Sequence, residues 1–225
     1  MVPAFVDWFY GNNDWPAFVG SSFITLFVGA VCFLSNRGIV TEHLELRQAF
    51  LLTNSAWISI ALFGSLPFMF SQIDMSFTDA IFESTSGITT TGATVINNLD
   101  STSHGILIWR ALLQWLGGVG IIVMALAVLP MLSIGGMQLF KTESYETPDK
   151  VVPKAASFAA GISLVYISLT TIWAVMLWVA GMPIFDSIAH AMTTLATGGY
   201  STRSDSLAAF GSPSIEIIII FGMIV

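Results

Sequence analysis

The sequence is poor in charge and in cysteine. Only 9% of its 225 residues are charged, whereas 55% are hydrophobic, and soluble domains carry about 25% charged residues. This lack of charge excludes an ordinary soluble protein and indicates a membrane protein. The single cysteine, Cys32, lies in an apolar segment. It excludes an intramolecular disulfide, and we expect it to be a small core residue.

The patterns of common enzyme and metal sites are also missing. The histidines are scattered without metal-ligand spacing, and no HExxH, GxSxG or GxGD pattern occurs. The glycine-rich stretches 116–120 and 133–136 lie in apolar sequence without a lysine or a following strand. We expect them to allow close helix packing, not phosphate binding. We therefore predict a protein that is not an enzyme, binds no cofactor covalently and has no nucleic-acid partner.

Long apolar runs occupy most of the chain. Three of them are long enough to cross the roughly 30 Å hydrocarbon core as helices. They are residues 16–35, 48–70 and 155–182. A helix predicted over 106–139 would be about 51 Å long, so we expect a break at Pro130 or Gly135-Gly136, or a cytoplasmic extension. Residues 1–14 are polar and aromatic, which suits a headgroup interface.

The basic residues indicate an orientation. Five of the seven lie in the loops 37–47 and 141–154, and the positive-inside rule places both loops in the cytoplasm. The segments predicted to lie outside carry nine acidic residues against two arginines, which would concentrate cations at a pore mouth. Arg110 and Gln114 lie one turn apart at the outer start of a crossing. They are either interfacial anchors or a polar brace behind an ion site.

A short polar stretch separates two of the apolar runs. Residues 77–95 read FTDAIFESTSGITTTGATV, and we predict about three turns of helix up to Ile88. The following segment, 89–94, has no helical or strand period, and its β-branched residues and glycine disfavour a continued helix. Non-helical backbone at membrane depth is tolerated only where it lines water or is buried in protein. We predict a half-helix that returns as an extended loop, as in a carbonyl-lined selectivity filter; an ordinary outer loop is the alternative.

A second copy of this stretch favours the filter. Residues 185–202 read FDSIAHAMTTLATGGYST, and 197–199 fall where 91–93 fall in the first copy. Asp79 then matches Asp186 one residue out of step with the glycines. Paired, interrupted segments in corresponding positions of a repeat point to a transport site.

The same residues resemble a known family. FESTSGITTTGATV, WRALLQWLGGVGIIVMALAVLPML and HAMTTLATGGYSTRSDS are similar to the membrane subunit of bacterial Trk potassium-uptake systems, in the Trk/Ktr/HKT superfamily. The resemblance covers the chain from about residue 16. It implies a bacterial cytoplasmic-membrane protein with four helix–pore loop–helix units around one pore. It also implies a homodimer and a cytosolic nucleotide-binding regulatory subunit.

The resemblance assigns one filter glycine to each unit present here, Gly92 in the first and Gly198 in the second. The whole expected ion site is Thr90, Thr91, Gly92, Ala93, Ala196, Thr197, Gly198 and Gly199. Within it, we expect K⁺ at Thr90, Thr91, Gly92, Thr197 and Gly198.

The predicted fold is an all-α membrane protein with two of the four expected units. Residues 1–47 form an N-terminal interfacial segment, an extra helix and a loop, and 48–140 form the first unit. A cytoplasmic loop, 141–154, precedes the second unit, 155–225, which ends in a truncated helix. That last apolar run, 215–225, would be about 16 Å long, half of what the core requires. We therefore expect a natural protein about twice as long.

We predict transport of potassium, with sodium as a second candidate ion, through a carbonyl-lined filter. Two alternatives stay open. One is a secondary carrier whose re-entrant hairpins bind a solute or coupled ion at the midplane, and the other is a structural subunit that carries no ion. The sequence leaves the choices between channel and symporter, and between potassium-only and mixed selectivity, undecided.

Overall fold

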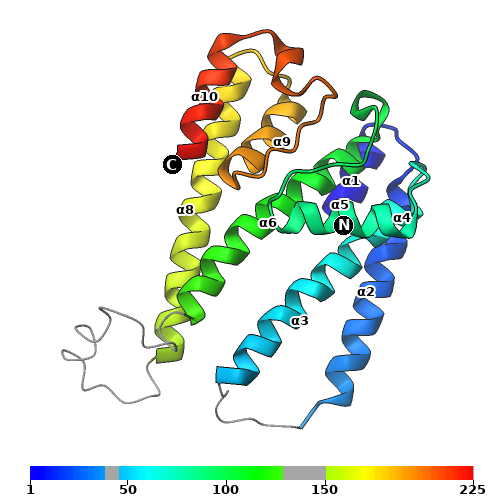
Figure 1. The fold of residues 1–225 in the computed structure, drawn as a ribbon, viewed down its shortest axis with the longest axis vertical. Coiled ribbons are helices and arrows are strands. Elements are labelled where there is room, and N and C mark those ends of the chain that lie inside the picture. The colour runs from blue at the N-terminus through cyan, green and yellow to red at the C-terminus, as the bar shows by residue number, and fades with distance from the viewer. Residues whose placement is uncertain (39–45, 129–150, 225) are drawn as a thin grey trace, which may run out of the picture.

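The computed structural model describes residues 1–38, 46–128 and 151–224, and every regular element in those ranges is helical (Figure 1). The helices are α1 (Val2–Phe9), α2 (Trp15–Ser35), α3 (Leu46–Gly64), α4 (Leu66–Phe70), α5 (Phe77–Ile88), α6 (His104–Val128), α8 (Val151–Val179), α9 (Ile184–Leu195) and α10 (Pro213–Ile224). Two 3-10 helices, η1 (Leu99–Ser101) and η4 (Ser206–Phe210), lie in the loops that follow α5 and α9. The expectation of an all-α fold is met in the described residues.

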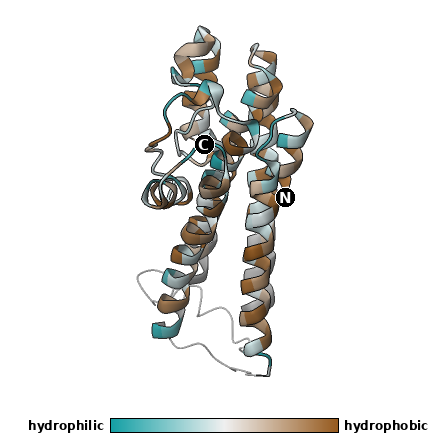
Figure 2. Cartoon of the chain, turned by 90° about the vertical axis from the view of Figure 1, so that its right-hand side faces the viewer, coloured by the Kyte–Doolittle hydropathy of each residue, from teal (hydrophilic) through white to brown (hydrophobic). Residues whose placement is uncertain are grey.

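Four helical segments are long and apolar enough to cross a membrane. They are Trp15–Ser35, Phe50–Phe70, His104–Ile122 and Ala160–Val179. Burial separates one of them from the rest, because 56% of the His104–Ile122 window is buried, against 11% to 22% in the others. Hydrophobic residues dominate the long helices, as the brown colour in Figure 2 shows. Exposed apolar surface of this extent is expected to face lipid, so α6 is the central helix of the membrane part.

The first two crossings follow the predicted ranges, but the second is divided into two helices and one residue of the first is not buried as expected. The crossing predicted over 48–70 consists of α3 and α4, which meet at Ser65. Pro67 follows at once, and proline has no N–H for a continued helical ladder. The expectation that Cys32 is a core residue is wrong: it is exposed, because the buried residues of α2, Ala17, Phe18 and Ser21, lie near its N-terminus.

The later helices are described over part of their predicted ranges. Helix α6 begins at His104 and runs to Val128, and the positions proposed for its break, Pro130 and Gly135-Gly136, lie outside the described residues. Helix α8 begins at Val151, inside the loop predicted over 141–154. The N-terminal segment forms α1, whose Asp7 carboxylate accepts a hydrogen bond of 2.8 Å from the Gly105 N–H at the start of α6.

Helix α6 packs against helices from both halves of the chain. It contacts α1, α3 and α5 on one side, and α8 and α9 on the other. Two of its tryptophans make these contacts specific: the Trp109 Nε1–H donates to the Gly64 carbonyl oxygen at 3.0 Å, and the Trp115 Nε1–H donates to the Thr170 hydroxyl at 3.0 Å. Helices α5 and α9 therefore both lie against α6.

Candidate functional site

Helix α5 starts with a side-chain cap and ends just before a residue with a left-handed backbone conformation. The Asp79 N–H donates to the Ser76 hydroxyl at 3.2 Å, and that hydroxyl donates to the Asp79 carboxylate at 2.7 Å. The first of these bonds satisfies one of the N–H groups that a helix start leaves free, and the second fixes the Ser76 hydroxyl in place. The helix ends at Ile88 because Thr90 has a left-handed φ of 56°. The prediction of a short helix ending at Ile88, with a non-helical segment behind it, is confirmed.

Helix α9 ends in the same way. Thr197 has a φ of 51°, and Gly199 has a φ of 79°. In the first copy Gly92 also has a φ of 79°, two residues after Thr90. Non-glycine residues adopt this conformation at a cost of roughly 1–2 kcal/mol, so its repetition at both loops is a strong structural match.

The repeat register corrects one pairing made from the sequence. Thr90 pairs with Thr197 and Gly92 with Gly199, so the counterpart of Gly198 is Thr91. The hydrogen bonds agree: the Thr91 N–H donates to the Ser86 carbonyl, and the Gly198 N–H donates to the Thr193 carbonyl, both at 2.9 Å. The pairing of Gly92 with Gly198 is therefore wrong. The alignment of Thr91-Gly92 with Thr197-Gly198 led to the wrong glycine. The alignment of Asp79 with Asp186 pairs Gly92 with Gly199, as the structure does.

Side-chain contacts repeat in the same register. The Thr94 hydroxyl donates to the Glu83 carboxylate at 2.9 Å and accepts from the Ile96 N–H at 3.1 Å. In the second copy Ser201 replaces Thr94, and its hydroxyl lies 3.1 Å from the His190 Nε2. The two loops thus share one backbone frame, with a carboxylate holding the first and an imidazole holding the second.

A buried ion pair joins the two loops. The Arg110 Nε–H donates to the Glu83 carboxylate at 2.7 Å, and both side chains are at most 1% exposed. A second guanidinium nitrogen of Arg110, Nη1, donates to the Ser201 carbonyl oxygen at 3.0 Å. The guanidinium carbon also lies 4.0 Å from the centre of the Tyr200 ring. Glu83 and Arg110 are therefore buried and paired, and they do not belong to the exposed charges that were expected at the outer mouth.

Two carbonyl groups of the predicted ion site are engaged within the protein. The Gly198 carbonyl oxygen accepts from the Gln114 Nε2–H at 2.8 Å. The Ala93 carbonyl oxygen accepts from the Ser86 hydroxyl at 2.6 Å and from the Tyr200 hydroxyl at 3.1 Å. The two bonds to the Ala93 oxygen use both of its lone pairs, whereas the bond from Gln114 uses one of the two lone pairs of the Gly198 oxygen and directs that oxygen toward α6.

The eight predicted site residues lie on the two loops and differ in exposure. Thr91, Ala93, Thr197 and Gly199 are exposed, and Thr90 and Gly92 are half-buried, whereas Ala196 and Gly198 are buried. The loops touch at the glycines, because a Cβ atom built on Gly92 would overlap the Gly198 carbonyl oxygen. The structure therefore brings the two predicted segments together.

A second cluster ties the loops together farther out. The Arg203 Nη2–H donates to the buried Asp186 carboxylate at 2.8 Å, and this bond raises the pKa of Arg203. The Leu99 N–H donates to the Ser204 hydroxyl at 3.0 Å. The side-chain hydrogen bond from Ser204 lowers the pKa of Asp100 below its ordinary value. Both groups stay charged at neutral pH.

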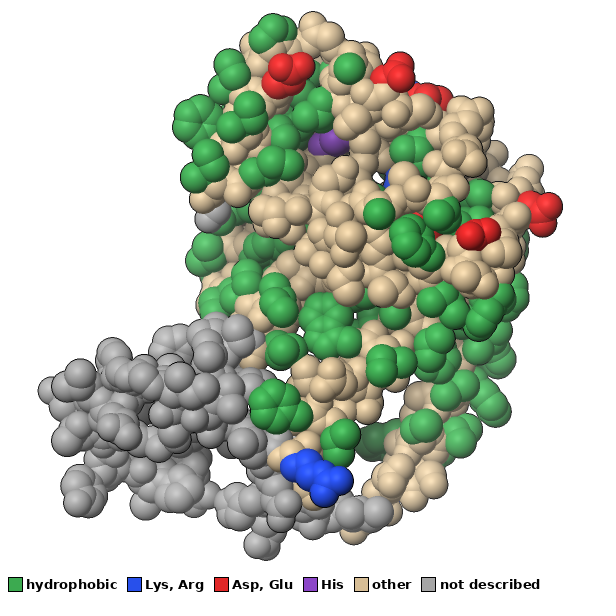
Figure 3. Space-filling view, viewed as in Figure 1, with side chains coloured by type: hydrophobic (Ala, Val, Ile, Leu, Met, Phe, Trp, Pro, Cys, Tyr) green, Lys and Arg blue, Asp and Glu red, His purple; other side chains and the backbone are tan. Residues whose placement is uncertain are grey.

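Acidic and basic side chains separate on the surface. In Figure 3 the acidic side chains lie on the upper part of the face, around the loops, and the exposed basic side chain lies at the lower end. Arg203, which is 39% exposed, is an exception because it pairs with Asp100 and Asp186; the orientation expected from the basic loops stays a prediction. In the described residues no group of three or more His, Cys, Asp or Glu side chains could hold a metal ion.

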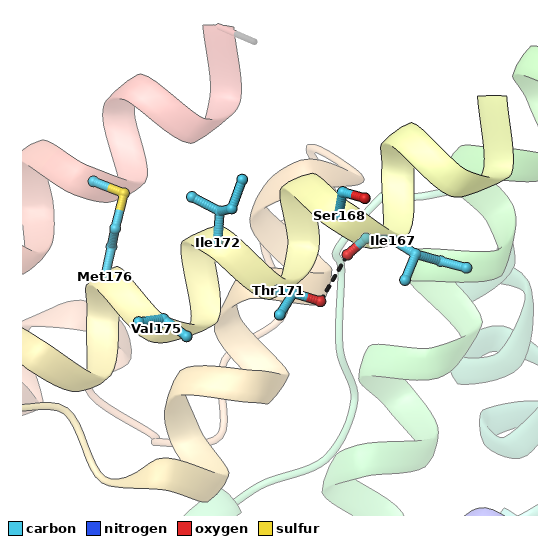
Figure 4. A pocket seen from close by; sticks show the side chains of 6 residues that line it. All are labelled: Ile167, Ser168, Thr171, Ile172, Val175 and Met176. Carbon is cyan, nitrogen blue, oxygen red and sulfur yellow. Dashed lines mark hydrogen bonds between the residues drawn. The ribbon is translucent and has the colours of Figure 1, made fainter. Parts of the chain in front are cut away.

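A shallow hollow on α8 lies apart from the loops. Its volume is about 500 Å³, and its lining residues all come from α8: Ile167, Ser168, Thr171, Ile172, Val175 and Met176. Figure 4 shows that the Thr171 hydroxyl turns back to the Ile167 carbonyl oxygen, to which it donates at 2.9 Å. The hollow presents mainly aliphatic surface, as expected of a lipid-facing helix.

Fold and site define a multi-pass membrane protein in which two copies of a short helix and loop meet beside a central helix. A protein-family model named TrkH and described as a cation transport protein matches residues 15–225. The chain belongs to this family, whose members are membrane transport proteins. It is accordingly a multi-pass protein of the cytoplasmic membrane.

Individual relatives agree with this assignment. The chain is 43% identical over 222 residues to the Trk system potassium uptake protein TrkH of Salmonella typhimurium, covering 97% of the chain and 46% of that protein. It is 37% identical over 179 residues to TrkG of Escherichia coli K12, covering 78% of the chain and 37% of that protein. The potassium transporter TrkH from Vibrio parahaemolyticus superposes with a TM-score of 0.86 at 40% identity, over 98% of this chain and 44% of that one. The chain spans about half the length of the curated TrkH relatives that it matches.

Several residues that hold the loops were not predicted to do so from the sequence. They are His190, Tyr200 and Ser201, and also Glu83, which was expected only as one of the acidic residues at the outer mouth. Glu83 and His190 occupy the same position of the repeat, and both are buried. Two polar residues at one repeat position, each followed eleven residues later by a hydroxyl residue, were a signal that the correct register would have revealed. Of the two roles considered for Arg110 and Gln114, the structure supports the polar brace.

Proposed function

We propose that this protein carries potassium ions across the cytoplasmic membrane through a narrow passage lined by backbone carbonyl oxygens of the loops after α5 and α9. The observation that carries the proposal is the repeated backbone, with left-handed residues at the same two positions of each loop. Carbonyl groups on such a loop can replace the hydration shell of a cation. The names of the relatives, which are potassium uptake proteins, support the choice of ion.

The two short helices favour a cation electrostatically. Helices α5 and α9 end at Ile88 and Leu195, immediately before the loops. The carboxyl end of a helix carries a partial negative charge, equivalent to roughly half an elementary charge. We propose that both ends face the ion and that the helices enter the membrane from the outer side as re-entrant half-helices. The outer acidic residues, such as Asp79 and Asp205, would then lie near the entrance.

The repeat register refines the proposed ion contacts. In the first loop they are Thr90, Thr91 and Gly92. In the second loop they are Thr197 and Gly199, because the Gly198 carbonyl is already held by Gln114. Ala93 and Ala196 flank the passage. Sodium remains a second candidate ion, since carbonyl number and flexibility decide between the two ions.

The transport unit has partners in this proposal. The relatives are components of a Trk system by name, and we propose a cytosolic nucleotide-binding regulatory subunit that acts on the cytoplasmic side. We also propose that the transporting form is a homodimer.

Ion uptake tests the proposed function. The protein in its full natural length is expressed in a potassium-starved host, and uptake of rubidium, as a potassium substitute, is compared with uptake of sodium. We expect saturable but rapid rubidium uptake that exceeds sodium uptake. Gly92→Ser should lower that preference, whereas Gly11→Ser should not, although Gly11 also has a positive φ of 72°. Uptake that requires a coupled ion would instead support a carrier, and no uptake would support a structural subunit.

A further inference from the structure

We infer that Arg110 and Gln114 are positioning residues that hold the second loop against the first, and that position 198 is glycine in order to admit the Gln114 side chain. This inference rests on the proposed function, because it assigns a selectivity role to residues that themselves touch no ion. Its three supports are the contacts of Gln114, the contacts of Arg110 and the space around Gly198.

Gln114 is fully buried and uses both ends of its amide on one loop. Its Nε2–H donates to the Gly198 carbonyl oxygen at 2.8 Å, and its Oε1 accepts from the Tyr200 N–H at 3.1 Å. These two contacts clamp the backbone on either side of Gly199. Because Gln114 belongs to α6, the first unit of the chain determines where the second loop sits.

Arg110 performs a similar task one turn earlier on the same face of α6. It pairs with Glu83, which holds the first loop through the Val95 N–H at 3.0 Å and the Thr94 hydroxyl. It also donates to the Ser201 carbonyl oxygen of the second loop. A planar guanidinium can satisfy both partners at once, whereas a lysine ammonium presents a single point charge.

The second unit has no matching brace. Counted from the start of each helix, at His104 and Pro213, Arg110 and Gln114 correspond to Ile219 and Met223 of α10. Neither side chain carries an N–H or O–H group that could donate a hydrogen bond to a loop. The polar bracing of the loops therefore comes from one helix, α6, and does not follow from the repeat itself.

The space at Gly198 differs from that at the neighbouring glycine. Gly198 has no left-handed φ, and the three atoms nearest to a Cβ built there all belong to the Gln114 amide group. Gly199 is the reverse case: its φ is 79°, and nothing lies within 4 Å of its Cβ position. Gly198 is thus required by packing, and Gly199 by conformation.

This difference allows a test by double-mutant cycles. The variants are Gly198→Ala, Gln114→Ala and their combination, with Gly199→Ala alone and with Gln114→Ala as the matched control. Melting temperatures of the purified full-length protein in detergent measure folding, and the ratio of rubidium to sodium uptake measures selectivity. Coupling between residues in contact appears as non-additivity.

We expect Gly198→Ala to lower the melting temperature strongly in the wild-type background and only slightly in the Gln114→Ala background. Gly199→Ala should lower it equally in both. Gln114→Ala alone should reduce the uptake ratio about tenfold, the equivalent of about 1.4 kcal/mol, while rubidium uptake persists. Arg110→Lys should also reduce the ratio while leaving uptake measurable.

Two results would overturn the inference. One is an equal effect of Gly198→Ala in both backgrounds, and the other is an unchanged uptake ratio in Gln114→Ala. A wild-type protein without rubidium uptake would instead overturn the proposed function, and the melting cycle would still report on the contact between Gln114 and Gly198.

Discussion

The two loops have the same backbone but different side chains around it. In the first, the anchor is Glu83, a carboxylate neutralised by Arg110. In the second, it is His190, whose Nδ1 donates to the Asp186 carbonyl oxygen at 2.8 Å and whose Nε2 then accepts from Ser201. The backbone is the part that an ion passage needs, and the comparison shows that unlike anchors can produce it.

The comparison also shows where the two loops depend on each other. Tyr200 of the second loop donates its hydroxyl to the Glu83 and Ala93 carbonyl oxygens of the first, at 3.0 and 3.1 Å. Its ring lies against the Arg110 guanidinium. The first loop is thus held by the Glu83–Arg110 ion pair, and Tyr200 holds the two loops to each other. Variants of the two anchors should therefore differ in severity.

Removal of Arg110 should have the largest effect. Arg110→Ala leaves Glu83 as a buried carboxylate without its cation, and loss of one partner of a buried pair costs about 3–5 kcal/mol. We expect a large fall in melting temperature and poor recovery of folded protein in detergent. The matched control is Arg203→Ala, because Arg203 is 39% exposed and water can take its place beside the Asp186 carboxylate, which also accepts from the Thr202 hydroxyl. Equal stability of both variants would contradict the central role of Arg110.

Substitution of the two glycines that occupy the same repeat position, Gly92 and Gly199, should have the next largest effect. Gly92→Ala and Gly199→Ala both place a side chain at a φ of 79°, which costs roughly 1–2 kcal/mol. Gly92→Ala should be the more damaging, because its Cβ also overlaps the Gly198 carbonyl. Thermal melting and rubidium uptake of both variants provide the measurement. A harmless Gly92→Ala would refute the close contact of the loops.

The second anchor should be less costly to remove than the first. His190→Leu deletes two neutral hydrogen bonds and leaves the Ser201 hydroxyl without its imidazole partner, a loss of about 1–2 kcal/mol. Ser201→Ala, which deletes one of these bonds, is the smaller control change. Melting temperatures should rank Arg110→Ala below His190→Leu and His190→Leu below Ser201→Ala. A reversed order would show that the second loop is the better anchored of the two.

The smallest effect concerns the outer contact between the loops. Hydrogen bonding from Ser204 lowers the pKa of Asp100 from its ordinary value of 3.8. A carboxyl group whose pKa falls on folding stabilises the protein above its unfolded pKa, and that contribution is lost as the pH falls through its folded pKa. The difference in melting temperature between the wild type and Asp100→Asn should therefore shrink between about pH 5 and pH 3. A difference that stays constant would show that Asp100 is not held by Ser204.

The sequence predicted the helices and the two loop segments because their signals are local. Apolar runs indicate the crossings, and the change to Thr89–Thr94 marks the end of α5. The anchors depend on contacts between distant residues, such as Glu83 with Arg110 and Tyr200 with Ala93. The sequence alone could not show which of two adjacent glycines matches Gly92. Gly198 and Gly199 are the same residue type, and they differ only in φ and in the atoms around them.

The position of the ion tests the central claim most directly. Crystals of the full-length protein grown with rubidium in place of potassium would locate the ion by its anomalous scattering. We expect rubidium between the carbonyl oxygens of residues 90–92 and those of Thr197 and Gly199. Rubidium bound only at the outer carboxylates, away from both loops, would contradict the account.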